Sequence, residues 1–316
     1  MKRALVVSVG GSKGAYGGGI IQYYHSIGIR YDILIGCSTG SLIVPFIASG
    51  NMISLKKAYT SITHKDIFTI SPFKIKEGKN GIYKYTLNNL NIFYNTVIRR
   101  KVSLGDSTVL REKTIPKFFT REDYNKIIAE GKELEIGVSN LTLGLAEFKK
   151  IEDFTYDEFC DWIWASTCAP PYMSVPQIGE YQYVDGALVS VVPVSQAVIK
   201  GADEIDVIIL DKEYPEISNI ELIRNPIHLI MKCEDVTFNT IKKHNLNLGM
   251  LSDIARKDVR INLHYTERKL TNNSLIFSST QMSKWWDEGF EYAKSGKCKS
   301  YMLHGESNTY RLIQED

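Results

Sequence analysis

The chain of 316 residues has few of the features that mark secreted, membrane-spanning or nucleic-acid-binding proteins. Its five cysteines are an odd number without a C-x-x-C pair, which argues against a disulfide framework and for reduced thiols in an intracellular setting. No run approaches the roughly 18 consecutive apolar residues of a membrane-spanning helix. The net charge of +2 gives no basic excess, so we expect no nucleic-acid partner.

A secretion signal and a metal site are also missing from the sequence pattern. Lys2 and Arg3 precede an apolar stretch, but residues 4–9 are too few for the core of a signal peptide and fit a first strand better. The histidines and cysteines show no ligand spacing, so we expect neither a metal nor a cofactor. We therefore expect a cytoplasmic protein whose contact with a membrane is peripheral. Nothing in the sequence indicates an oligomeric state.

The most informative stretch that is present is Gly36-Cys37-Ser38-Thr39-Gly40. Residues 31–35 before it form a short apolar run typical of a buried strand, and residues 39–50 after it predict a helix that ends in a glycine. A serine between two glycines at a strand-to-helix turn is the G-x-S-x-G nucleophile elbow, in which side chains at Gly36 and Gly40 would collide with neighbouring elements. We expect Ser38 to be a nucleophile at a helix N-terminus and Cys37 to point into the core.

A glycine-rich turn, Gly10-Gly11-Ser12-Lys13-Gly14, joins the first predicted strand to a helix. A dinucleotide cradle would need the spacing G-x-G-x-x-G, which Val9 breaks, and a Walker loop would need Ser or Thr after Lys13. The better interpretation is an oxyanion hole, in which the amides of Gly10, Gly11 and Ser12 face the carbonyl that Ser38 attacks. Close helix packing explains the glycines at 17–19 better.

A carboxylate stands at the end of a later strand. Residues 181–184 alternate like a strand, and Asp185-Gly186-Ala187 ends it on a turn. Active sites of α/β proteins gather at strand ends, so Asp185 is a candidate base for the serine. When this segment is considered alone, an ordinary Asp-Gly turn explains it better.

Together these three segments, in this order, resemble the patatin-like phospholipase family, over about residues 3–210. The resemblance implies a three-layer α/β sandwich with a mostly parallel sheet, and a Ser38–Asp185 dyad without histidine. It implies hydrolysis of acyl esters of phospholipids or other lipids, of the phospholipase A or lysophospholipase kind. It also gives motif or substrate-binding roles to Lys13, Gly14, Gly36, Gly40, Gly186 and Ala187. The family usually has a glycine at the position of Val9, a departure that we expect to affect packing more than catalysis.

Chemically, Asp185 would take the proton of Ser38 as an acyl-enzyme forms, and burial should raise the pKa of Asp185 to make it a better base. One alternative is an esterase of the α/β-hydrolase type, with a triad completed by His264 or His304. Two further alternatives are a catalytically silent lipid-binding effector and a nucleotide-dependent enzyme.

We expect a single domain, residues 1–316, with a catalytic core at 3–210. A helical, lid-like insertion is expected at about 70–103, and a helical C-terminal part at 211–316, with helices at 219–257 and 281–294 around a strand at 259–264. The insertion has one acidic residue, Glu77, and interleaved aromatic residues among seven basic residues: Lys74, Lys76, Lys79, Lys84, Arg99, Arg100 and Lys101. It is either an interfacial surface for anionic lipids or a solvated excursion whose aromatic residues pack on the core.

Overall fold

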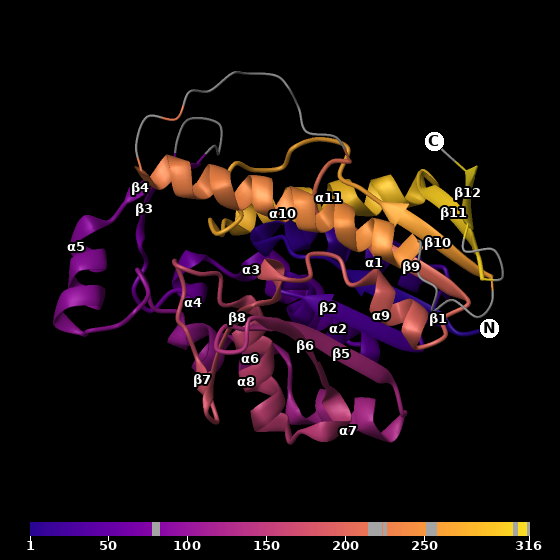
Figure 1. The fold of residues 1–316 in the computed structure, drawn as a ribbon, viewed down its shortest axis with the longest axis horizontal. Coiled ribbons are helices and arrows are strands. Elements are labelled where there is room, and N and C mark those ends of the chain that lie inside the picture. Colours follow the sequence, from indigo (N-terminus) through magenta and orange to yellow (C-terminus); the bar gives the residue numbers. More distant parts are fainter. Residues whose placement is uncertain (78–82, 214–222, 224–225, 251–257, 306–308, 315–316) are drawn as a thin grey trace.

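The computed structural model describes residues 1–77, 83–213, 223, 226–250, 258–305 and 309–314 (Figure 1). Its centre is a sheet with the strand order β12-β11-β10-β9-β1-β2-β5-β8-β7, and β6 pairs with β5. The strands of this sheet are β1 (Arg3–Val7), β2 (Ile33–Cys37), β5 (Glu133–Asn140), β6 (Leu145–Lys150), β7 (Gln177–Ile178), β8 (Tyr181–Asp185), β9 (Glu204–Ile208), β10 (Val259–His264), β11 (Lys299–His304) and β12 (Thr309–Gln314).

The middle of the sheet is parallel and its two margins are antiparallel. The parallel part consists, in spatial order, of β10, β9, β1, β2 and β5. At one margin β6 and β8 run antiparallel to β5, and at the other β11 runs antiparallel to β10. All five residues of β2 and four of the five in β1 are buried, as expected for strands covered on both faces. The expected mostly parallel sheet flanked by helices is thus confirmed.

Helices cover both faces of the sheet and create two hydrophobic cores. Leu5 and Val7 of β1 pack with one set of helices, whereas Ala4 and Val6, whose side chains alternate to the other face, pack with α9 and α10. The α-helices are α1 (Gly14–Ser26), α2 (Thr39–Ser49), α3 (Met52–Ser61), α4 (His64–Ile67), α5 (Asn89–Phe93), α6 (Ile115–Phe118), α7 (Arg121–Ala129), α8 (Tyr156–Thr167), α9 (Val194–Ile199), α10 (Pro226–Met250) and α11 (Ser279–Lys294). Short 3-10 and π segments are η1 (Gly11–Lys13), η3 (Tyr94–Ile98), η4 (Leu110–Thr114), η5 (Ile151–Asp153) and η6 (Gly186–Leu188).

Glycines let α1 and α11 approach each other closely. A Cβ atom at Gly19 would overlap the carbonyl oxygen of Trp286, and one at Gly289 would overlap that of Tyr16. The side chains of Trp285 and Trp286 are buried in this contact. The packing interpretation of the glycines early in α1 is therefore confirmed, and the tryptophans of α11 belong to the core.

The structure differs from the sequence-based expectation in two segments. The insertion begins as an antiparallel hairpin of β3 (Phe73–Glu77) and β4 (Tyr83–Leu87), and only its second half, α5 and η3, is helical. The C-terminal part contains the expected long helices but also extends the sheet by β10, β11 and β12. Of the helix expected at 219–257, α10 is described, while residues 219–222, 224–225 and 251–257 lie outside the described residues. None of the described helices combines the length and the apolar character needed to cross a membrane.

Candidate active site

The serine elbow lies between β2 and α2. Ser38 has φ 55° and ψ −123°, a conformation that is strained for a residue with a side chain. A Cβ atom at Gly36 would overlap the backbone of Gly40, and one at Gly40 would overlap the carbonyl of Val7. The two glycines of the motif are therefore required by contact, as the sequence predicts, and Cys37 is fully buried.

Asp185 lies at the end of β8 beside this serine. The Ser38 hydroxyl donates a hydrogen bond of 2.6 Å to Asp185 Oδ2, and the Ala187 amide donates one of 2.9 Å to Asp185 Oδ1. Strand order explains the meeting, because β5 pairs with both β2 and β8. Ser166 holds the elbow in place: its hydroxyl accepts from the Ser38 amide at 3.0 Å and donates to the Gly137 carbonyl at 2.7 Å.

The environment of Asp185 changes its acidity. Burial raises the pKa of Asp185 to about 7, against the hydrogen bonds from Ser38 and Ala187, which lower it. Both side chains are largely shielded, since Ser38 is 7% and Asp185 4% exposed. A carboxylate that titrates near neutral pH can accept and return a proton during turnover, which agrees with the expectation drawn from its burial.

A cavity of about 200 Å³ opens next to the two side chains. Residues from the N-terminal loop, the elbow and η6 line one side of it, and Met231, Glu234 and Phe238 of α10 line another. A smaller, apolar cavity of about 40 Å³ adjoins it and shares Leu42, Ile67 and Leu110 with it. The site therefore combines a polar reaction centre with an apolar extension.

The glycine-rich loop forms one wall of this cavity. Gly10 and Gly11 line it, and neither amide donates a hydrogen bond to another described residue. The Ser12 amide, which we expected to point the same way, instead donates to the Ser274 carbonyl at 2.8 Å. Gly11 has φ +52°, and a Cβ atom there would overlap that same carbonyl. Of the three amides, those of Gly10 and Gly11 are thus the ones without a partner among the described residues. Val9 packs against the second core and also lines the cavity.

Two lysines converge on the cavity near this loop. Lys13 lines it, and Lys242 Nζ reaches in from α10 to lie 3.6 Å from Asp211 Oδ2. Although burial opposes the change, Lys13 and Lys242 together lower the pKa of Asp211. Lys13 and Lys242 are the cations among the described residues that line the cavity, and Asp211, Glu234 and Asp235 line it as well. Sequence reasoning found Lys13 but missed Lys242, because only the tertiary position of α10 brings it here.

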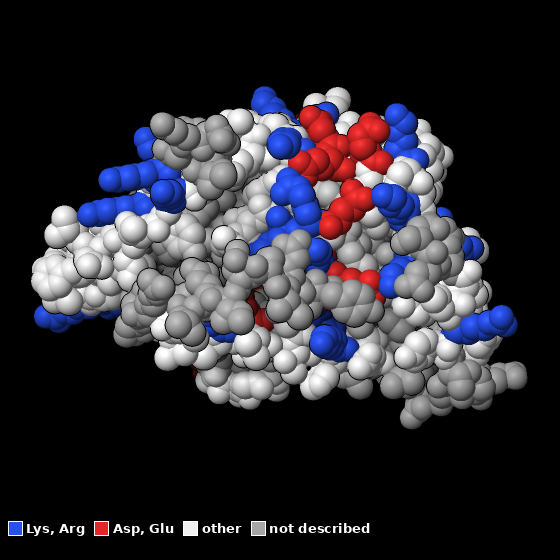
Figure 2. All heavy atoms as spheres, turned by 90° about the horizontal axis from the view of Figure 1, so that it is seen from above, with Lys and Arg blue, Asp and Glu red and all other residues white. Residues whose placement is uncertain are grey.

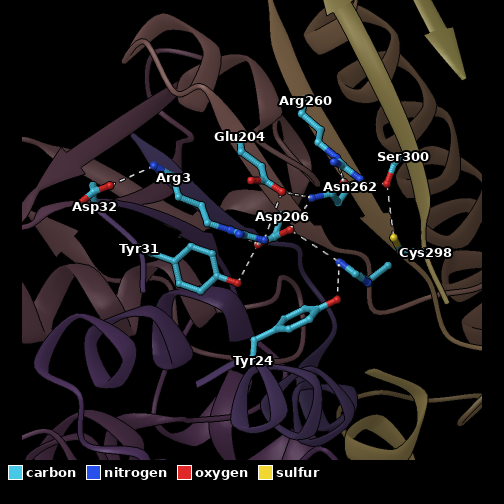
Figure 3. A network of polar contacts seen from close by, with 11 residues as sticks. Arg3, Tyr24, Tyr31, Asp32, Glu204, Asp206, Arg260, Asn262, Cys298 and Ser300 are labelled. Atoms are coloured by element: carbon cyan, nitrogen blue, oxygen red, sulfur yellow. Dashed lines mark hydrogen bonds and ion pairs between the residues drawn. The ribbon is translucent and has the colours of Figure 1, made fainter. Parts of the chain in front are cut away.

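The two histidines of the alternative triad lie elsewhere. His264 is fully buried at the end of β10, where its Nε2 is 4.0 Å from Asp206 Oδ1 and 3.4 Å from the Tyr24 hydroxyl. Figure 3 shows the polar network around Asp206. His304 contacts Asp258 at 3.2 Å, and neither histidine lines the cavity. Within the described ranges, no group of three or more His, Cys, Asp or Glu side chains is arranged to hold a metal ion.

Comparison with known proteins identifies the family of the chain. The model of the patatin-like phospholipase family matches residues 5–198, and the chain belongs to this family. Membership supports lipid acyl hydrolysis as the general activity. Among solved structures, VipD from Legionella pneumophila matches with 12% sequence identity and a TM-score of 0.46, covering 96% of this chain and 68% of that chain. No curated protein sequence matches the chain.

Proposed function

We propose that the protein is a serine hydrolase that cleaves carboxylic esters of membrane phospholipids, as a phospholipase A or lysophospholipase does. The observation that carries this proposal is the 2.6 Å hydrogen bond from the strained Ser38 to Asp185, whose pKa burial raises to about 7. A buried acid–hydroxyl pair of this kind at a cavity suits nucleophilic catalysis without histidine.

In the acylation step, Asp185 takes the hydroxyl proton as Ser38 Oγ attacks the ester carbonyl carbon. The Gly10 and Gly11 amides hold the negative charge that develops on the carbonyl oxygen, and each such donor contributes about 3–4 kcal/mol in comparable sites. Asp185 then gives the proton to the departing alcohol oxygen as the C–O bond breaks. In deacylation, water attacks the acyl-enzyme, Asp185 accepts its proton, and the proton returns to Ser38 as the fatty acid leaves.

The cavity suggests how a phospholipid is oriented. We assign its phosphate to the part of the cavity near Lys13 and Lys242, because these two lysines are the cations among its described lining residues. The acyl chain enters the smaller cavity, whose lining is almost wholly apolar. Leu42 stands where the two cavities meet, so it is positioned to control how far the chain enters.

A fluorophosphonate probe tests the proposal, because it labels activated serines. We expect covalent labelling of the wild type and none of Ser38→Ala, together with release of free fatty acid from membrane lipids detected by mass spectrometry. A wild type that is folded but neither labelled nor active would favour the silent lipid-binding effector. Saturable binding of a nucleotide that depends on Gly10 and Gly11 would favour the nucleotide-dependent enzyme.

A further inference from the structure

The insertion carries a helix whose apolar face points to solvent. α5 and η3 continue each other over residues 89–98 and stand away from the body at the left of Figure 1. Five apolar side chains repeat at intervals of three and four residues, and each is at least half exposed: Leu90 (74%), Phe93 (56%), Tyr94 (50%), Val97 (53%) and Ile98 (60%). This spacing places them on one face of the helix, which we call the outer face.

The side chains of Asn91 and Asn95 in the same helix face the protein. Asn91 donates to the Ser71 carbonyl at 3.0 Å, and the fully buried Asn95 donates to two carbonyls at 2.9 and 3.1 Å. Arg99 forms an ion pair with Asp106 at 2.5 Å. A surface helix of a soluble protein normally has the opposite arrangement, so the outer face is built for an apolar partner. Arg99 serves as an anchor of the helix and is not available to that partner.

The hairpin beside this helix has a basic face. Lys74, Lys76 and Lys84 are exposed on it, and Lys76 lies directly opposite Lys84 across the strand pair. Like charges placed in this way repel each other. Arg100 and Lys101 follow the helix, and none of these five cations forms an ion pair with another described residue. Figure 2 shows Lys and Arg side chains gathered at the end of the molecule where Figure 1 places the hairpin and α5.

Some aromatic residues of the insertion pack on the core and others face solvent, so each of the two interpretations drawn from sequence, core packing and an interfacial surface, applies to a part of them. Phe73 is buried, and Tyr83 and Tyr85 pack on the core, whereas Phe93 and Tyr94 are exposed on the outer face. Lys79 lies outside the described residues. The residues of the insertion that remain for an interfacial surface are therefore those of the outer face and of the basic face of the hairpin.

We propose that the outer face inserts into a lipid bilayer with anionic headgroups, while the basic face of the hairpin binds those headgroups. A projecting apolar helix bordered by cations fits the apolar interior and negative surface of such a bilayer. Phe73, in the same hairpin, lines the active-site cavity, so docking here brings a wall of the cavity to the lipid surface. The choice of lipid as the occupant rests on the proposed function.

Vesicle sedimentation of the full chain tests the outer face. The inactive Ser38→Ala background keeps the vesicles intact, and vesicles are made of phosphatidylcholine with or without phosphatidylglycerol. We expect the triple variant Leu90→Ser, Phe93→Ser and Ile98→Ser to bind both vesicles at least tenfold more weakly. The control is Ile53→Ser, Leu143→Ser and Ile199→Ser, which removes apolar residues that are 83%, 53% and 51% exposed elsewhere and should bind like the parent.

A second triple variant tests the basic face. Lys74→Gln, Lys76→Gln and Lys84→Gln should weaken binding to the anionic vesicles by about fivefold for each charge that reaches the surface, and should flatten the salt dependence. Binding to neutral vesicles should not change. The matched control, Lys57→Gln, Lys113→Gln and Lys243→Gln, removes three exposed lysines elsewhere and should behave like the parent.

The docking surface would be overturned if the parent did not bind vesicles, or if the outer-face variant bound them as well as the parent does. If the parent binds no vesicles but self-associates, and the outer-face variant abolishes this self-association, the outer face is an interface between two copies. Hydrolysis of a soluble p-nitrophenyl ester, measured with Ser38 restored, should be equal in all variants and reports on folding and the dyad. Binding without any hydrolysis would refute the proposed function and leave the docking surface standing.

Discussion

Replacing Asp185 with asparagine should abolish hydrolysis and at the same time stabilise the protein above neutral pH. Asparagine has the shape of aspartate, so its oxygen can still accept from the Ala187 amide and its amino group can donate to Ser38. It cannot take the serine proton, and it places no charge in a buried site. The structure thus predicts that replacing one carboxylate oxygen of Asp185 by an amide nitrogen lowers the activity and raises the stability.

The size of the stability effect follows from the pKa of Asp185, which is about 7 in the folded protein and 3.8 for an unperturbed aspartate. Between pH 4 and 7 the folded protein retains a proton that the unfolded chain has lost. The contribution of Asp185 to the stability of the wild type therefore falls as the pH rises through this window and is constant above it. The pKa difference of about three units corresponds to a loss of about 4 kcal/mol in unfolding free energy, at roughly 1.4 kcal/mol for each unit. This loss is a large share of a typical folding free energy.

Urea unfolding of both proteins at several pH values measures this effect, because all other titrating groups cancel in the difference. The advantage of Asp185→Asn in unfolding free energy should grow by about 3 kcal/mol between pH 4.5 and pH 8. The activity of the wild type should rise with pH through about 7, as the base loses its proton. A difference in stability that is independent of pH would refute the argument from burial, and turnover by the variant would refute the role as base.

Further predictions concern the rest of the site. Ser38→Ala should lose ester hydrolysis by several orders of magnitude with an unchanged fold by circular dichroism; residual turnover near the wild-type rate would exclude it as nucleophile. His304→Ala should retain most activity, because this histidine lies outside the cavity, and a large loss would revive the triad. Gly10→Ala should lower kcat at least tenfold with a smaller change in KM, because a Cβ atom there overlaps the Leu210 side chain and displaces an amide that acts on charge present only in the transition state. Gly11→Ala should lower Tm more than Gly10→Ala does, because of its positive φ and its overlap with the Ser274 carbonyl. Leu42→Trp should cut kcat/KM for a decanoate ester about tenfold and spare the acetate, and equal losses would mean that the acyl chain lies elsewhere.

Local chemistry allowed much of the site to be predicted from the sequence. A strand, a glycine, a serine and a second glycine specify the elbow, because the turn tolerates no Cβ atom at Gly36 or Gly40. The apolar runs at β1 and β2 predict buried parallel strands, and Gly50, with φ 72°, ends α2 as expected. These features depend on neighbouring residues alone, so their periodicity and spacing are visible in the chain.

Long-range packing decided what the sequence left open. Ser38 and Asp185 are 147 residues apart, and they meet only because β5 pairs with both of their strands. The Ser12 amide is not available to the proposed oxyanion hole, because it donates to the Ser274 carbonyl. The sequence of the insertion shows interleaved basic and aromatic residues but not which of them face solvent. In α5 and η3 the direction depends on the folded path of the flanking loops, whose carbonyls and Asp106 bind the polar side chains and leave the apolar ones exposed.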